Sequence, residues 1–155
     1  MKIEGILAIA NKENLNGRVY SPEVLQNMVK QFENNKPMLG ELGMPSDSIV
    51  SLKNASHKMT SMRIDRSRLP RKKKKILKKR GIYQKWKNNN GRILFGTIEL
   101  LDTESGELAK KMFEDKTAVV RSRGIGNVND GKVQDYSLIS FDIIHKDDDA
   151  FGNII

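Results

Sequence analysis

The spacing of apolar residues along the chain alternates between a period typical of strands and one typical of helices. Residues 2–9 are a short, mostly apolar run that predicts a first strand. A polar stretch rich in turn-forming residues follows at 11–20. Ser21-Pro22-Glu23 then has the N-cap, first-turn proline and first-turn acid with which helices begin. The apolar residues behind it recur at helical spacing and predict a stripe packed on the core: Val24, Leu25, Met28, Val29 and Phe32.

The rest of the chain predicts more strand than helix. Residues 38–48 hold two glycines and a proline and are expected to form an irregular loop. Partial alternation from His57 to Ile64 favours a strand. Further strands are expected at 92–101, 117–120 and 132–145, and a short helix at 107–115. The order β-α-β-β-α-β-β predicts one α+β domain over residues 1–155, with a small, barrel-like, mostly antiparallel sheet and two or three helices.

Charge is distributed unevenly along the chain. The formal net charge is +9, from 28 basic and 19 acidic residues. Residues 66–87 hold twelve basic residues and no acid, so the remainder has a net charge of −3. The basic residues are Arg66, Arg68, Arg71, Lys72, Lys73, Lys74, Lys75, Lys78, Lys79, Arg80, Lys85 and Lys87. Residues 66–90 are therefore expected to be a basic insertion, an extended arm or loop, between two strands that otherwise form a hairpin.

The basic insertion has two interpretations. Phosphate contacts by its cations would make binding to nucleic acid sensitive to salt, and Trp86 would stack on bases beside Tyr83. Alternatively, the insertion is a solvated loop or an arm that docks on an acidic neighbouring protein. Nothing in it predicts recognition of base edges. Both packaged DNA and protein partners therefore stay open for residues 66–90.

The residue types present exclude several kinds of chemistry. The chain has no cysteine, which excludes a disulfide scaffold, thiol catalysis and cysteine-based zinc sites. It has only two histidines, His57 and His145, which disfavours a histidine-rich metal site. No apolar run approaches the length that spans a bilayer. We therefore expect no metal, no cofactor and no membrane association.

Residues 119–127 are the candidate centre of any chemistry. A β-branched pair leads into Arg121, Ser122 and Arg123, and then into Gly124 and Gly126. Such a stretch is expected to form a tight turn that aims a serine and backbone N–H groups at one point. If the site is active, Ser122 is the nucleophile, His57 its base and Glu41 the orienting carboxylate.

Several motifs, taken in order, resemble the prohead core proteases of tailed bacteriophages, of the T4-like type and distantly related to herpesvirus assemblin. They cover nearly the whole chain outside the basic insertion, at residues 14–20, 39–45, 55–57, 96–106, 121–126 and 141–144. The resemblance implies serine proteases that trim scaffold and capsid proteins. Their nucleophile lies in a Ser-Ser-Arg-Gly stretch and their base in a Gly-Glu-Leu-Asn-His-Pro stretch.

The chain departs from the family pattern at both catalytic positions. Met44 stands where the resemblance places the histidine, and Arg121 where it places the first serine. A thioether takes no proton from a hydroxyl, and arginine stays protonated. These departures favour a pseudo-protease over a serine endopeptidase.

The sequence therefore predicts a structural protein, an auxiliary or minor capsid component or one at the portal vertex. We expect it in the virion of a tailed phage, assembled in the bacterial host cytoplasm and anchored by the basic arm. Its expected partners are the major capsid protein or portal and neighbouring virion proteins, with packaged DNA as a further candidate. The alternatives are an active prohead maturation protease and a DNA-contacting internal head protein.

Overall fold

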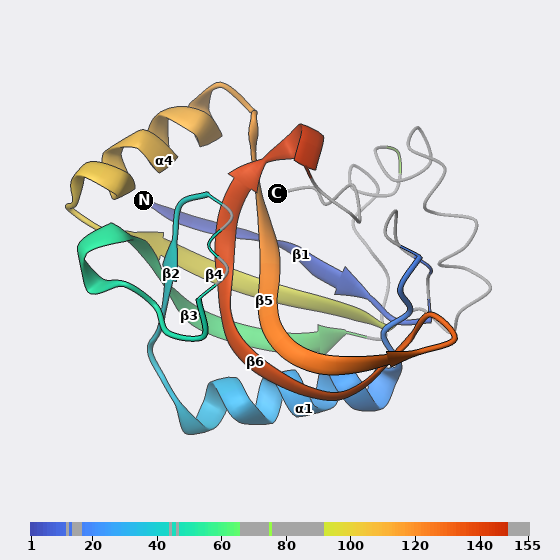
Figure 1. The fold of residues 1–155 in the computed structure, drawn as a ribbon. Helices are drawn as coiled ribbons and strands as arrows, with labels where there is room; N and C mark the ends of the chain where they lie inside the picture. The colour runs from blue at the N-terminus through green and yellow to red at the C-terminus, as the bar shows by residue number, and fades with distance from the viewer. Residues whose placement is uncertain are drawn as a thin grey trace.

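The computed structural model describes residues 1–11, 13, 17–43, 45, 47–65, 75 and 92–148. This part of the chain contains six strands and two α-helices (Figure 1). In chain order they are β1 (Lys2–Ile9), α1 (Pro22–Asn34), β2 (Met38–Glu41), β3 (Ala55–Asp65), β4 (Ile93–Leu100), α4 (Glu104–Glu114), β5 (Ala118–Asn129) and β6 (Lys132–His145). The predicted α+β class and the mostly antiparallel pairing are confirmed.

Four strands form one antiparallel sheet in the order β1-β4-β3-β2. β3 and β4 pair from His57 with Leu100 to Asp65 with Ile93, as the two strands of a hairpin do. This agrees with the predicted pairing of the strands on either side of the basic segment. The segment itself, residues 66–90, lies outside the described residues except for Lys75.

β5 and β6 form a second, two-stranded sheet, a long curved hairpin over one side of the first (Figure 1). Its register shifts twice, between Arg123 and Gly124 and between Ile125 and Asn127 of β5. The prediction of a tight turn at 119–127 is wrong, because β5 continues through these residues. Bulges, which bend and twist a hairpin, replace the turn.

The prediction of a barrel-like sheet is corrected by this arrangement. Within the described residues the strands form two separate sheets and no closed barrel. β6 meets the chain after β2 through one isolated parallel bridge, between Leu42 and Ile143. A single bridge does not continue a ladder around the domain, so the two sheets face each other instead.

β2 lies within residues 38–48, where an irregular loop was predicted. Its Gly40 lies against His57 and the backbone carbonyl of Phe141, so closely that any Cβ at this position would collide with both. The glycine therefore reflects a close approach of three strands rather than a turn. The loop prediction failed because a glycine required by a close approach of strands and a glycine required by a turn look alike in the sequence.

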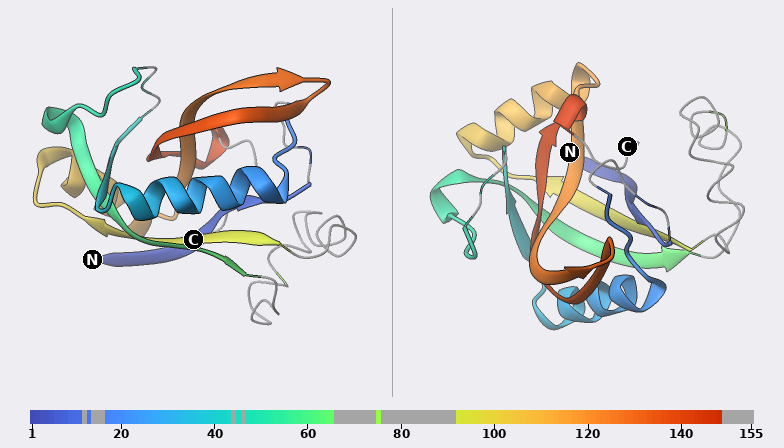
Figure 2. Two further views of the ribbon diagram at one scale, coloured as in Figure 1. Left: turned by 90° about the horizontal axis from the view of Figure 1, so that it is seen from below. Right: turned by 45° about the vertical axis from the view of Figure 1, so that its right-hand side comes forward.

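The helices form as their caps predict. Ser21 accepts a hydrogen bond from the N–H of Val24 at 3.2 Å and caps α1. α1 packs on β3 and β6, and so lies between the two sheets, as the left view of Figure 2 shows. Its buried residues are Val24, Leu25, Met28 and Phe32, while Val29 is only partly buried. The predicted stripe thus faces the core with one residue at its margin.

α4 begins three residues earlier than predicted. Thr103 is its N-cap and accepts a hydrogen bond from the N–H of Gly106 at 2.9 Å. The same hydroxyl donates to the carbonyl of Ala55 at 2.7 Å, which ties the helix to the start of β3. Neither described helix is long and apolar enough to cross a membrane.

Candidate functional site

The candidate base His57 lies in β3 with its side chain completely buried. Its Nδ1 is 2.8 Å from the Ser56 hydroxyl oxygen, and its Nε2 is 2.7 Å from the carbonyl oxygen of Phe141. Because a carbonyl oxygen only accepts hydrogen bonds, Nε2 donates to Phe141, and Nδ1 accepts from Ser56. Burial lowers the pKa of His57 to about 4, although the bond to Phe141 opposes that shift. Both ring nitrogens are therefore bonded within the core.

The candidate nucleophile Ser122 lies in β5, opposite Phe141 of β6. It is half-buried, and its hydroxyl is hydrogen-bonded to the hydroxyl of Tyr136. His57 also contacts Phe141, through the backbone carbonyl of Phe141. The structure thus brings Ser122 and His57 to the same residue of β6 without joining them by a hydrogen bond.

Glu41, the candidate orienting residue, lies at the end of β2 and points to Arg123 instead of His57. Its Oε2 is 2.9 Å from Nη2 of Arg123, and both side chains are buried. The three residues that would make a rebuilt catalytic site therefore have three different sets of partners.

The structure instead contains a buried charge cluster, which we define as Arg123, Glu41, Asp142 and Ser140. Nε of Arg123 is 2.9 Å from Oδ2 of Asp142, and its Nη1 donates to the carbonyl of Asp47 at 3.1 Å. Ser140 accepts from Nη2 of Arg123 at 3.1 Å and donates to Oδ1 of Asp142 at 2.9 Å. The cluster ties β2 to both strands of the β5–β6 hairpin.

Two carboxylates share one guanidinium in this cluster. Burial raises the pKa of the Asp142 carboxyl, while the N–H of Glu41, the Ser140 hydroxyl and Arg123 oppose that shift. The Glu41 N–H lies 3.0 Å from Oδ1 of Asp142. Arginine stays protonated in proteins, so its guanidinium keeps both carboxylates engaged in buried ion pairs. Its chemistry is that of a brace between strands.

One position at which the sequence departs from the protease pattern, and the residue before the other, lie beside β6. Met44 itself lies outside the described residues. The residue before it, Gly43, donates its N–H to the carbonyl of Ile143 at 2.8 Å. Arg121 is half-buried and pairs in register with Asp142. The chain before position 44 and the residue at position 121 thus lie beside consecutive residues of one strand.

The predicted basic site cannot be located in the same way. Its residues Arg66, Arg68, Arg71 and the others to Lys87, with Trp86, lie outside the described residues except Lys75, which is exposed. Binding to DNA or protein by this segment stays a prediction.

Sequence reasoning assigned no role to Arg123, Asp142 or Tyr136. One signal was available for Asp142: it stands alone as a charge among the bulky apolar residues Phe141, Ile143 and Ile144. A carboxylate in such a run is expected to be buried and therefore paired. Its partner is 19 residues away and was not predictable from spacing.

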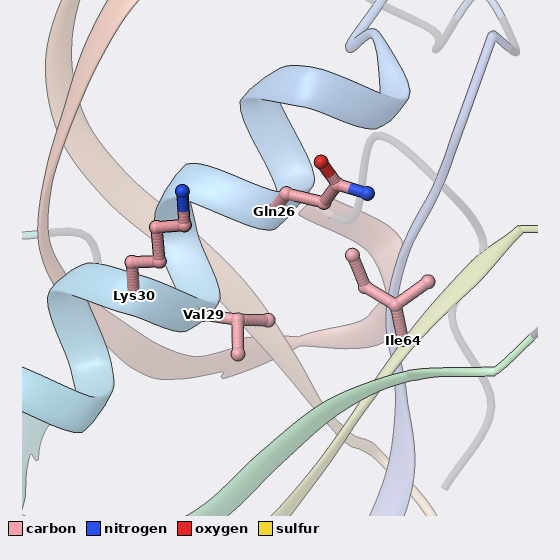
Figure 3. A pocket seen from close by; sticks show the side chains of 4 residues that line it. All are labelled: Gln26, Val29, Lys30 and Ile64. Carbon is pink, nitrogen blue, oxygen red and sulfur yellow. The ribbon is translucent and has the colours of Figure 1, made fainter.

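A groove of about 350 Å³ lies between α1 and the end of β3, lined by Gln26, Val29, Lys30 and Ile64. Figure 3 shows Gln26 and Val29 facing Ile64, while Lys30 extends away from it. The described residues of the lining include no pair of groups suited to nucleophilic chemistry. Among the described residues there is also no group of three or more metal-ligating side chains.

Comparison with known proteins identifies the fold. No protein family matches the sequence, and no curated protein matches it. Among solved structures, the chain is similar to the bacteriophage T4 capsid assembly protease gp21, with a TM-score of 0.68 and 23% sequence identity. The similarity covers 92% of this chain and 80% of that chain. The expected prohead-protease-like fold is thereby confirmed.

Proposed function

We propose that this chain is a non-catalytic structural component of a tailed-phage head, built on the fold of a capsid assembly protease. The observation that carries the proposal is the bonding of His57. Its ring nitrogens are held by Ser56 and by the carbonyl of Phe141 inside the core. A general base must reach the proton of the nucleophile, and a base with a pKa of about 4 accepts protons poorly near neutral pH.

The residue types at the former catalytic positions support the same conclusion. Met44 and Arg121 stand where the protease pattern has its histidine and its first serine. The second histidine of the chain, His145, is exposed at the end of β6, with its Nδ1 3.4 Å from Oδ2 of Asp147. With two histidines and no cysteine in the sequence, neither another imidazole nor a thiol can replace the missing pair.

The charge cluster supports the proposal that the fold has a structural role here. Arg123 belongs to the Arg-Gly of the Ser-Ser-Arg-Gly stretch, and it braces three strands through Glu41 and Asp142. Removing one partner of a buried ion pair is strongly destabilising because it leaves an uncompensated charge. The presence of Arg123 in this stretch is therefore explained by its contribution to stability, and no nucleophile is needed to explain it.

The similar T4 protein is a capsid assembly protease, which supports an inference about partners and location. We infer that this chain resides in the phage head, assembled in the bacterial cytoplasm, against the major capsid protein, the portal or neighbouring virion proteins. Residues 66–90 would anchor it, because their positive charge is suited to an acidic protein surface or to packaged DNA.

A cleavage assay tests the proposal. The purified chain is incubated with the scaffold and major capsid proteins of the same phage, and intact masses are followed by mass spectrometry. We expect both proteins, and the chain itself, to remain uncut. Cleavage that disappears in Ser122→Ala, but persists in the control Ser61→Ala on the exposed part of β3, would establish the protease alternative instead.

A role as a DNA-contacting internal head protein is favoured by one observation, the twelve cations of residues 66–87. Electrostatic binding to phosphates weakens steeply with salt. If DNA is the partner, deletion of residues 66–90 abolishes salt-sensitive binding to a random-sequence duplex in a filter assay. If protein is the partner, the deletion instead abolishes incorporation of the chain into particles. Any weak DNA binding by the intact chain then has no bearing on assembly.

A further inference from the structure

The groove between α1 and the end of β3, which we name the α1–β3 groove, has no role in the proposed function so far. Its volume is about 350 Å³, and its described lining is Gln26, Val29, Lys30 and Ile64. Figure 3 shows Gln26 and Val29 facing Ile64, with Lys30 beside them on the same helix. Two of these residues are apolar, one is cationic and none is acidic.

The apolar part of the groove lies at the margin of the core. Val29 and Ile64 pack against the core cluster, but each stays only half-buried. Val29 lies beside the buried stripe of α1, and Ile64 lies one residue before the end of β3. Because removal of apolar surface from water favours association, a side chain that covers these two residues would be stabilised there.

Lys30 brings a positive charge that the described residues do not compensate. It is exposed and forms no ion pair within the described part of the chain. α1 contains two acids. Glu33 is paired with Lys36 at 2.6 Å, and Glu23 precedes Lys30 by two turns, about 10 Å along the helix axis. The charge of Lys30 is therefore free to pair with a partner.

The strong positive charge of the sequence also begins beside the groove. Ile64 is two residues before Arg66, so their Cα atoms are at most about 7 Å apart. Residues 65–87 hold twelve basic residues and the single acid Asp65, a net charge of +11. The surface that complements the groove and this segment together is therefore negatively charged.

We propose that the α1–β3 groove binds an acidic peptide segment of a neighbouring protein. A large apolar side chain of that segment covers Val29 and Ile64, and a carboxylate pairs with Lys30. Gln26 offers an amide that both donates to and accepts from a peptide backbone. The inference rests on the proposed function, which supplies a protein neighbour in the head, and it specifies the chemistry of that neighbour. The apolar lining favours a peptide over DNA, since phosphates cover no apolar surface.

The experiment is a nuclear magnetic resonance titration of the full ¹⁵N-labelled chain with a short capped peptide that alternates glutamate with leucine. We expect saturable shifts at the backbone amides of Val29, Lys30 and Ile64 and at the side-chain amide of Gln26. Peptides with lysine in place of glutamate, or serine in place of leucine, should each bind several-fold more weakly. Absence of saturable shifts at these residues, or equal binding by the lysine peptide, overturns the proposal.

Matched variants separate the groove from general attraction to a basic chain. Lys30→Gln should raise the Kd about threefold, the loss of one exposed ion pair. Val29→Thr replaces one methyl group by a hydroxyl at nearly constant shape and should raise the Kd about fourfold. Lys110→Gln removes an equal charge from an exposed position of α4 and should leave the Kd unchanged. The amide spectrum reports whether each variant is folded. A Kd unchanged in both groove variants overturns the proposal.

A random-sequence DNA duplex tests the other class of partner. We expect it to leave the signals of Gln26 and Val29 unshifted. Shifts there that are lost in Lys30→Gln but kept in Val29→Thr would assign the groove to nucleic acid and overturn the proposal, as would peptide shifts confined to residues 66–90. The titration measures binding, whereas the cleavage assay measures proteolysis. A failed titration therefore leaves the structural role standing, and specific cleavage would overturn that role without affecting the groove.

Discussion

Two arginines that lie two residues apart on β5 have opposite surroundings. Arg123 is buried and its guanidinium bonds two carboxylates, a hydroxyl and a backbone carbonyl. Arg121 is half-buried and forms no ion pair among the described residues, although it acts electrostatically on Tyr136. The difference teaches that one residue type braces the fold where buried partners compensate its charge, and contributes only electrostatically where no described residue pairs with it.

The same contrast extends to the regions around them. The buried charge cluster holds β2 on the hairpin, next to the enclosed His57. A pocket of about 320 Å³ beside Tyr136 is lined in part by the exposed Ile125 and Val128. Substitutions in the first region should therefore lower stability more than those in the second.

The largest expected effect is that of Arg123→Met. It leaves Glu41 and Asp142 buried without a cation, and should lower the free energy of unfolding by about 3–5 kcal/mol. Arg121→Met is the matched control at a half-buried residue that forms no ion pair among the described residues, and it should lower the free energy of unfolding by no more than about 1 kcal/mol. Urea unfolding followed by circular dichroism measures both. Equal losses would remove the distinction between the two arginines.

The next effect concerns pH. The unfolded chain has a histidine pKa of 6.5, whereas folded His57 has one of about 4, so the unfolded state binds more protons between these values. Stability contributed by neutral His57 is present above pH 6.5 and is lost as pH falls to 4, by about 3 kcal/mol. Asp142, whose pKa is raised, acts with the opposite sign, since its contribution falls as pH rises through that pKa.

Comparison with His57→Gln isolates the histidine contribution. The difference in unfolding free energy between pH 6.5 and 4 should shrink in this variant, while His145→Gln at the exposed end of β6 should behave as the wild type. An unchanged pH dependence in His57→Gln would mean that the buried histidine does not set it, and would weaken the basis of the non-catalytic proposal.

A smaller effect is expected from Gly124→Ala. The new Cβ would collide with the ring of Tyr136 and with the backbone of Ser137, so overpacking should lower stability by about 1–3 kcal/mol. Gly126→Ala meets its neighbours at 3.0 Å or more and should be milder. Thermal unfolding distinguishes them. The reverse order would contradict the packing assigned to Tyr136.

The smallest effect is that of Gln31→Ala. It removes two hydrogen bonds to β6 and leaves the N–H of Leu138 and the carbonyl of Tyr136 to water, for about 1–2 kcal/mol of stability. Gln26→Ala, on the same helix at the groove of Figure 3, is the control and should leave stability nearly unchanged in urea unfolding. An equal loss of stability in both variants would point to the helix as a whole.

Much of the fold was predictable from local pattern. The apolar stripe of α1 and its Ser21 cap act over one helical turn, so they can be read directly in sequence. The pairing of β3 with β4 followed from two strand-like runs on either side of a polar segment. The two positions at which the sequence differs from the resembled protease pattern, Met44 and Arg121, could also be predicted because they depend only on residue identity.

The site was less predictable, because its contacts join distant residues. Glu41 reaches Arg123 across 82 residues, and His57 reaches Phe141 across 84. The bulges that carry β5 through a predicted turn depend on its partner strand, and β2 depends on how closely Gly40 approaches its neighbours.

The sequence by itself determined the α+β class, the main elements and which residues, Met44 and Arg121, stand at the positions of the protease pattern, since these follow from periodicity and residue identity. Only the tertiary structure decided which polar side chains are enclosed and which face a pocket. The physical reason is desolvation: a charge or an imidazole takes its role from its burial and its partners, and on β5 these differ between Arg121 and Arg123.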